Sequence, residues 1–160
     1  MKKFLIWGGI LFGIIFVYVI TQILFGNYFE MSSELEVNIP ITTKMEYKDN
    51  HGGFFCEGET IAIVNFTEKQ ANNFYERIKE NEHWMEYPID ELIESHISNI
   101  EVEGTIIPKV ENGYWFIKDR HKQAINEYYY DKIYDRNSRN FSVGIYDVYS
   151  NTLYYFRQDT

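Results

Sequence analysis

The sequence predicts an α+β protein: an N-terminal transmembrane helix, then one small domain with a mainly antiparallel sheet and one or two helices packed on one face. Three observations lead to this prediction: a long apolar run near the N-terminus, several short segments of alternating apolar and polar residues, and one segment with helical spacing. The expected parts are a cytoplasmic tail over 1–3, the transmembrane helix over 4–25, a juxtamembrane linker over 26–37 and an extracytoplasmic domain over 38–160.

The apolar run extends from Phe4 to Phe25 and contains only two polar residues, Thr21 and Gln22. At about 1.5 Å per residue it is about 33 Å long, enough to cross a hydrocarbon core of about 30 Å. Its apolar residues lie all round the helix, whereas a helix of a small soluble domain would keep a polar face. The run is therefore interpreted as a single-pass signal-anchor whose partner is the lipid bilayer.

A cleaved signal peptide is the alternative interpretation of this run. Its apolar core is usually about 7–15 residues long and ends in a small-residue cleavage site. The observed run is longer and no such site follows it, which favours an uncleaved anchor. Gly9 and Gly13 form a G-x-x-x-G pattern that allows weak self-association of membrane helices. Glycine is also common in such helices without that role.

Charge next to the run predicts its orientation. Lys2 and Lys3 precede it, whereas the segment 26–37 contains Glu30, Glu34 and Glu36 and no lysine or arginine. Because basic residues stay in the cytoplasm, we expect a cytoplasmic N-terminus and a C-terminal domain outside the cell membrane.

The composition limits the possible partners. The net charge is −9, and without Lys2 and Lys3 the chain keeps 13 basic and 24 acidic residues, a charge of −11. Such an acidic chain is a poor ligand for nucleic acid, because phosphate binding needs a basic face. The single cysteine, Cys56, excludes an intrachain disulfide.

The first half of the domain predicts strands followed by a helix. Alternation over 38–48 indicates a strand with one wet face, and the β-branched run 60–66 indicates a central strand. A turn is expected over 49–53. Thr67 and Gln70 have the spacing of a capping box, and they begin a helix whose apolar stripe is Ala71, Phe74, Tyr75 and Ile78.

The second half predicts one short helix and two hairpins. The helix covers 90–97, with Leu92, Ile93 and Ile97 facing inward. Asn112-Gly113 predicts a hairpin that joins 106–110 to 114–118. A polar, tyrosine-rich loop follows over 119–140, and segments 141–146 and 153–158 are expected to pair as a C-terminal hairpin.

The only cysteine is a candidate catalytic residue, with two histidines and one aspartate that could assist it. Cys56 needs a base to become a thiolate, and His51 or His121 would serve, with Asp119 orienting the histidine. No local motif supports this arrangement, and a cysteine in a strand is more often a small buried apolar residue.

Candidate metal ligands are His51, Glu57, Glu59 and His121, with Asp119 beside the last. These residues offer the nitrogen and oxygen atoms that metals bind, but their spacing matches neither a zinc motif nor a calcium loop. A solvated acidic strand face beside a turn histidine is the simpler interpretation. No pattern predicts a cofactor.

Candidate binding-surface residues are aromatic: Trp84 and the triplet Tyr128, Tyr129 and Tyr130. The triplet lies in a polar loop, where exposed aromatic side chains often mark a contact surface. Tyrosine also packs against its own loop, which is the simpler alternative.

Three segments carry a resemblance to a known family: DNHGGFFCEGET at 49–60, ENGYWFIKDRH at 111–121 and NFSVGIYDVYSNTLYYFRQDT at 140–160. In these segments the chain resembles a family of small uncharacterised proteins of Gram-positive bacteria. The resemblance implies a membrane-anchored or lipid-anchored extracytoplasmic protein and implies no activity.

The leading hypothesis is a non-enzymatic binding domain at the cell envelope that contacts an unknown protein or envelope component through an acidic, tyrosine-rich face. An immunity-like protein that neutralises a toxin at the membrane is one form of this hypothesis. The first alternative is an envelope hydrolase that uses His51, Asp119 and His121. The second is a structural or assembly protein whose working part is the membrane helix.

Overall fold

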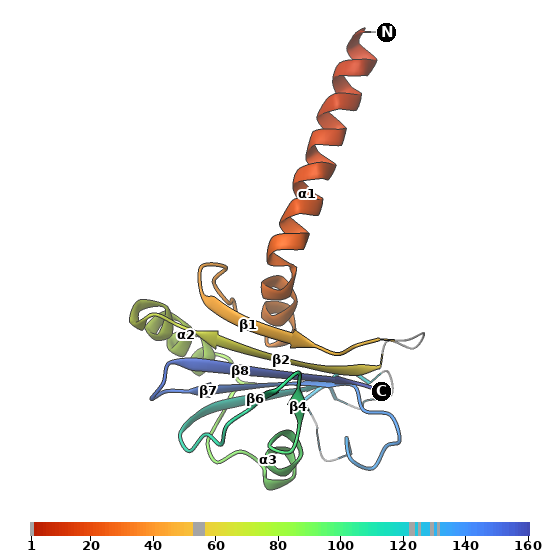
Figure 1. Ribbon diagram of the computed structural model, residues 1–160. Helices are drawn as coiled ribbons and strands as arrows, with labels where there is room; N and C mark the ends of the chain where they lie inside the picture. The colour runs from red at the N-terminus through yellow and green to blue at the C-terminus, as the bar shows by residue number, and fades with distance from the viewer. Residues whose placement is uncertain (1, 53–56, 122–123, 125, 129, 131) are drawn as a thin grey trace.

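The computed structural model describes the chain except residues 1, 53–56, 122–123, 125, 129 and 131, and it describes residues 2–6 by their backbone alone (Figure 1). A long helix leads into a domain built on one sheet. The elements in chain order are α1 Lys2–Glu34, β1 Lys44–Asp49, β2 Gly58–Asn65, α2 Glu68–Glu80, β3 Met85–Glu86, α3 Glu91–Ile97, β4 Glu101–Val102, β5 Thr105–Ile106, β6 Gly113–Asp119, β7 Phe141–Asp147 and β8 Thr152–Asp159.

The main sheet has six strands in the order β1-β2-β8-β7-β6-β3, and each neighbouring pair is antiparallel. The short strands β4 and β5 pair separately. This arrangement confirms the predicted fold class: an N-terminal apolar helix, a mainly antiparallel sheet and two further helices.

Both faces of the sheet are covered by apolar side chains. In β2, Ala62 and Val64 belong to a core that α2 and the end of α1 complete, whereas Ile61 belongs to a second core with α3. The helices therefore pack on opposite faces of the sheet rather than on one (Figure 1). The physical reason lies in the central strands, which are apolar at successive positions and must be covered on both sides.

The end of α1 is part of the domain. Met31 and Leu35 are fully buried, and Val37 and Ile39 follow them into the same core. The segment 26–37, expected to be a linker, is thus helical to Glu34 and supplies core residues, which corrects the expected boundaries. Apolar positions 31 and 35 are one helical turn apart, so they share one face of the helix.

Acidic residues at this end of α1 form ion pairs with the sheet. Glu30 pairs with Arg157 of β8, and Glu34 lies 3.4 Å from the Nε of Arg120. Glu36 lies 2.9 Å from the Nζ of Lys118. The acidic residues that mark one flank of the apolar run therefore also dock the helix on the domain.

The ion pair of Glu36 carries shifted pKa values. Burial raises the pKa of Glu36, but hydrogen bonds from Tyr128, Lys118 and His83 outweigh burial and hold it below the ordinary value. Burial lowers the pKa of Lys118, and its contact with Glu36 more than reverses this effect, so the net pKa is raised. Both shifts favour the charged pair in the folded domain.

Three local predictions are confirmed. The β7–β8 hairpin forms, with Asn151 in its turn at a φ of 53°. Helix α2 begins after Thr67, whose backbone N–H donates to the side-chain oxygen of Gln70 at 2.9 Å. Its residues Ala71, Phe74 and Ile78 are buried.

Three other local predictions are wrong in whole or in part. The strand predicted over 38–48 forms only as β1 from Lys44 onward. Residues 38–43 form an irregular segment and a turn, because Ile39 packs with Leu35 in the core while Ile41 points outward. Asn112-Gly113 does not form a hairpin, since β6 pairs with β7 and β3 rather than with β5. Leu92 is 63% exposed, because α3 buries only the face that carries Ile93 and Ile97.

The rest of α1 is apolar and uncovered. It is the one helix among the described residues that is long and apolar enough to cross a membrane, and its apolar part is not buried in the domain. Side chains from Trp7 to Val19 are mostly exposed, and Gly9 and Gly13 have open space around them. This helix is compatible with a single-pass membrane anchor or with a signal sequence.

Candidate functional site

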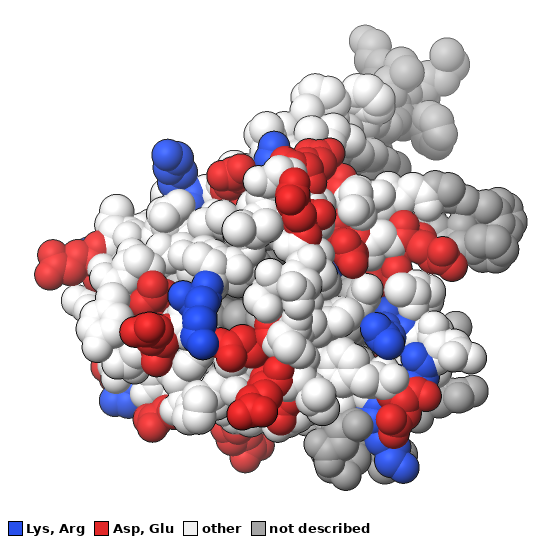
Figure 2. All heavy atoms as spheres, turned by 60° about the horizontal axis from the view of Figure 1, so that its bottom comes forward, with Lys and Arg blue, Asp and Glu red and all other residues white. Residues whose placement is uncertain are grey.

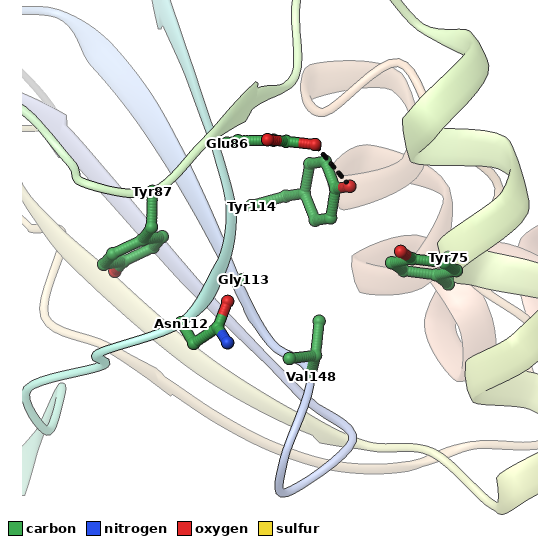
Figure 3. A pocket seen from close by; sticks show the side chains of 7 residues that line it. All are labelled: Tyr75, Glu86, Tyr87, Asn112, Gly113, Tyr114 and Val148. Atoms are coloured by element: carbon green, nitrogen blue, oxygen red, sulfur yellow. Dashed lines mark hydrogen bonds between the residues drawn. The ribbon is translucent and has the colours of Figure 1, made fainter.

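An open cleft of about 320 Å³ lies at the β3 end of the sheet, where β3 and the start of β6 meet α2 and the turn after β7 (Figure 3). Its lining is mostly aromatic and polar. The lining residues are Tyr75, Glu86, Tyr87, Asn112, Gly113, Tyr114 and Val148. Figure 3 shows Tyr75 reaching in from α2, opposite Tyr114 and Glu86.

Backbone pairing holds the two central side chains together. Glu86 of β3 pairs directly with Tyr114 of β6, so both side chains project from the same face of the sheet. The hydroxyl of Tyr114 donates to the Oε1 of Glu86 at 3.0 Å. The carboxylate of Glu86 therefore keeps a defined position beside the cleft.

Gly113 sets the close approach of β6 to β7 at the floor of the cleft. A Cβ atom on this residue would lie 1.8 Å from the carbonyl oxygen of Tyr146, which no side chain permits. The carbonyl of Gly113 also accepts from the backbone N–H of Tyr87 at 3.1 Å. Glycine at this position therefore lets β3, β6 and β7 meet.

Aromatic rings form one wall of the cleft. Tyr75 and Tyr114 meet edge to face, with ring centroids 5.6 Å apart. The Nζ of Lys79 lies 5.0 Å from the centroid of the Tyr75 ring, a distance typical of a cation–π contact. One face of this wall thus already holds a positive charge from the protein itself.

The hydroxyls of Tyr87 and Tyr114 stay protonated at neutral pH. Burial raises the pKa of Tyr114, and the hydrogen bonds with Tyr75 and Glu86 raise it further. Burial also raises the pKa of Tyr87, with the charges of Glu94 and Asp147 adding to the effect. The hydroxyl of Tyr87 can donate a hydrogen bond, whereas that of Tyr114 already donates to Glu86. Glu86 and Asn112 offer acceptor oxygens.

Two of the predicted catalytic residues, His51 and Asp119, do not come together. The Nε2 of His51 lies 3.0 Å from Asp159, whose carboxylate also accepts from Arg120 and Arg157 on the α1 face of the sheet. Asp119 is buried on the opposite face, where it pairs with Arg136. The register shows this directly, because Asp119 pairs with Phe141, a residue of the α3 core.

The other two catalytic candidates are His121 and Cys56. The backbone N–H of His121 donates to the Oδ1 of Asp119 at 3.0 Å. Cys56 lies outside the described residues. His51 and Asp119, on opposite faces, cannot act on one reacting group.

The predicted metal ligands are also dispersed. Glu59 accepts from Gln158 at 3.3 Å on the α3 face, whereas His51 bonds to Asp49 and Asp159. Glu57 is exposed. Among the residues that the structure describes, no group of three histidine, cysteine or acidic side chains is placed to hold a metal ion.

The predicted aromatic surface is largely a packing surface. Trp84 is buried in the core, which corrects its assignment to a binding face. Tyr128 stacks on His83 with ring centroids 3.5 Å apart and donates to Glu36 at 2.6 Å. Tyr130 meets the edge of Trp115 at 5.6 Å, and Tyr129 lies outside the described residues.

The cleft residues were not recognised as a site from the sequence. Tyr75 belongs to the apolar stripe of α2, and Glu86 and Tyr87 stand in a segment with no regular pattern. Only the pairing of β3 with β6 brings them together. Tyrosines beside a polar Asn-Gly pair were the available signal, and by themselves they indicated only a turn.

Comparison with protein-family models, with curated proteins and with solved structures finds no match for this chain. The resemblance carried by segments 49–60, 111–121 and 140–160 therefore stays an expectation.

Proposed function

We propose that this protein is a single-pass membrane protein whose domain lies outside the cytoplasm and binds a protein or an envelope component without catalysis. The observation that carries the proposal is the division of α1 into two parts. Side chains from Trp7 to Leu24 are apolar except Thr21 and Gln22 and are mostly uncovered, whereas Met31 and Leu35 are buried in the domain core. Such a helix joins a bilayer to a folded domain.

Charge supports the orientation in this proposal. Lys2 and Lys3 precede the apolar part of α1, and Glu30, Glu34 and Glu36 follow it. Retention of lysines in the cytoplasm leaves the domain outside the cell membrane. The resemblance to anchored extracytoplasmic proteins points the same way.

The cleft supports a binding role. Its tyrosine rings, the carboxylate of Glu86 and the amide of Asn112 suit a ligand that carries several hydroxyls. Acidic side chains are spread over the face of the domain shown in Figure 2, which favours a partner with positive charge. An immunity-like protein that binds a toxin remains one form of this proposal.

The proposal is tested in two steps with the full chain in intact membranes. Protease added from outside should cleave the domain, whereas a protected domain would contradict the orientation. A photo-crosslinking aromatic residue at Tyr149, which is 79% exposed and bonded to Asn112 at the cleft, should then capture a defined partner.

The matched control site for crosslinking is Ile106, which is 56% exposed on β5. Strand β5 pairs with β4, and β4 contacts β2, so Ile106 lies away from β3 and the cleft. A partner that binds the cleft should crosslink from Tyr149 and not from Ile106. The adduct should weaken with Glu86→Gln and persist with Glu91→Gln, whose carboxylate lies on α3. Equal capture from both sites, or repeated failure of capture at Tyr149, would contradict the binding role.

A further inference from the structure

The helix α1 is tied to the segment that follows it. The hydroxyl of Tyr28 donates to the carbonyl of Thr43 at 2.8 Å. The hydroxyl of Ser32 accepts from the backbone N–H of Ile39 at 2.9 Å and donates to the carbonyl of Tyr28. The return from α1 to β1 is therefore held against the helix, and in Figure 1 it rises beside the lower part of α1.

The tied segment closes into a tight turn over 40–43. The backbone N–H and the hydroxyl of Thr43 both donate to the carbonyl of Pro40, at 3.0 and 2.8 Å. The hydroxyl of Thr42 accepts from Gln70 at the start of α2. Thr43 is buried, so the turn has a fixed base, and Ile41 stands at its tip with 44% of its surface exposed.

This turn lies at the level where α1 leaves the apolar span. Tyr28 is three residues past Phe25, which is about 4.5 Å along the helix axis. Each headgroup layer of a bilayer is about 5–8 Å thick, half the difference between the hydrocarbon core and the whole membrane. With the span over 4–25 in the hydrocarbon, Thr43, bonded to Tyr28, lies within the headgroup layer.

The exposed apolar residues at this level come from two elements. Phe29, one residue past Tyr28, is 45% exposed, and Ile41 adds a second large apolar side chain from the turn. Across 37–45 the only charged residue is Lys44, although the domain as a whole is strongly acidic. An uncharged stretch with apolar side chains is compatible with a lipid surface, whereas acidic residues would be repelled by anionic headgroups.

We infer that the 40–43 turn and Phe29 form a second membrane contact, in which Ile41 enters the headgroup layer of the bilayer that α1 spans. This inference rests on the proposed function, because it requires α1 to be inserted. The domain then lies on the membrane surface instead of standing away from it. The contact selects the direction in which α1 and the attached domain tilt, since a single membrane helix alone leaves that direction open.

The test uses the full chain reconstituted in phosphatidylcholine vesicles, with a photo-crosslinking residue at one of three exposed positions. Val17 lies within the apolar span and reports insertion of α1. Ile41 reports the inferred contact. Leu92, 63% exposed on α3 on the far face of the sheet, is the control for accidental lipid capture. Lipid adducts are measured by mass spectrometry.

The expected result is a strong lipid adduct from Val17 and an adduct from Ile41 several-fold above that from Leu92. An adduct from Val17 together with equal, low adducts from Ile41 and Leu92 would overturn this inference and leave the anchor intact. Failure at Val17 would overturn the proposed function itself. Crosslinks from Ile41 to a second copy of the chain in place of lipid would also overturn the inference.

Discussion

The indole N–H of Trp84 donates to the backbone carbonyl of Leu35 at 3.1 Å. Leu35 directly follows the last residue of α1, where carbonyl groups have no partner within the helix. A side chain 49 positions away in the sequence supplies that partner and is itself buried. The end of the long helix is therefore fastened to the domain by a buried hydrogen bond as well as by apolar contact.

Replacing Trp84 by Phe should lower the free energy of unfolding, because the carbonyl of Leu35 would remain buried without its donor. A loss of about 1–3 kcal/mol is expected for such a group. Equilibrium unfolding of the detergent-solubilised chain measures it.

Trp115→Phe is the matched control, since Trp115 is equally buried and its indole nitrogen has no hydrogen-bond partner among the described residues. It should cost less than Trp84→Phe. Equal losses for the two variants would show that ring volume, not the hydrogen bond, stabilises the end of α1.

Gly144→Ala should destabilise the same region by crowding. The added Cβ would lie 2.8 Å from the Cδ2 of Leu35 and 2.9 Å from the ring of Trp84, and both side chains are buried. Overpacking of this kind costs about 1–3 kcal/mol. Thermal unfolding should show a lower midpoint for Gly144→Ala and little change for Gly52→Ala, where the nearest atom is 3.9 Å away. An unchanged midpoint for Gly144→Ala would contradict the packing described.

Stability should decrease in acid because of Glu36. Its pKa in the folded domain lies below the ordinary value of 4.5, so its contribution to stability is complete above that value and is lost as the pH falls through the lowered pKa. Unfolding measured between neutral pH and acid should show this loss. Glu36→Gln should be less stable than the native chain at neutral pH, and the difference between the two should shrink in acid. A constant difference at every pH would exclude the charge of Glu36 as its source.

The contact between Asp119 and Arg136 should hold the loop between β6 and β7 on the sheet. Asp119 is 1% exposed, so Arg136→Met leaves a buried carboxylate without its partner, a change that costs up to about 3–5 kcal/mol in buried pairs. Adding Asp119→Asn should restore part of the loss, because a neutral amide needs no counter-charge. If the double variant is as unstable as Arg136→Met alone, packing of the arginine rather than charge is responsible.

Sequence patterns correctly predicted elements that are determined by interactions among residues close in sequence. The capping box at Thr67 and Gln70 and the β7–β8 hairpin are of this kind, and both are confirmed. Asn112-Gly113 is a pair for which the sequence pattern predicted the wrong structure. The glycine is needed there for close approach to the carbonyl of Tyr146 in β7, a strand that comes later in the chain, and not for a tight turn.

The candidate site depended on tertiary pairing and could not be predicted. Trp84 and Tyr128 are aromatic residues in polar surroundings, a pattern shared by binding surfaces and by side chains that bond to another part of the same domain, here Leu35 and Glu36. Burial separates the two roles, and burial is a property of the whole fold. Glu86 meets Tyr114 only because β3 joins the edge of the sheet.

Because α1 is continuous, its apolar part and the domain move together as one rigid unit. Its 33 residues form one helix of about 50 Å whose C-terminal end is bonded to the domain. No flexible segment therefore separates the apolar part from the domain. A change in the tilt of α1 in a thicker or thinner bilayer would rotate the sheet and the tyrosine-lined cleft by the same angle. Membrane thickness would thereby set the direction in which the cleft opens.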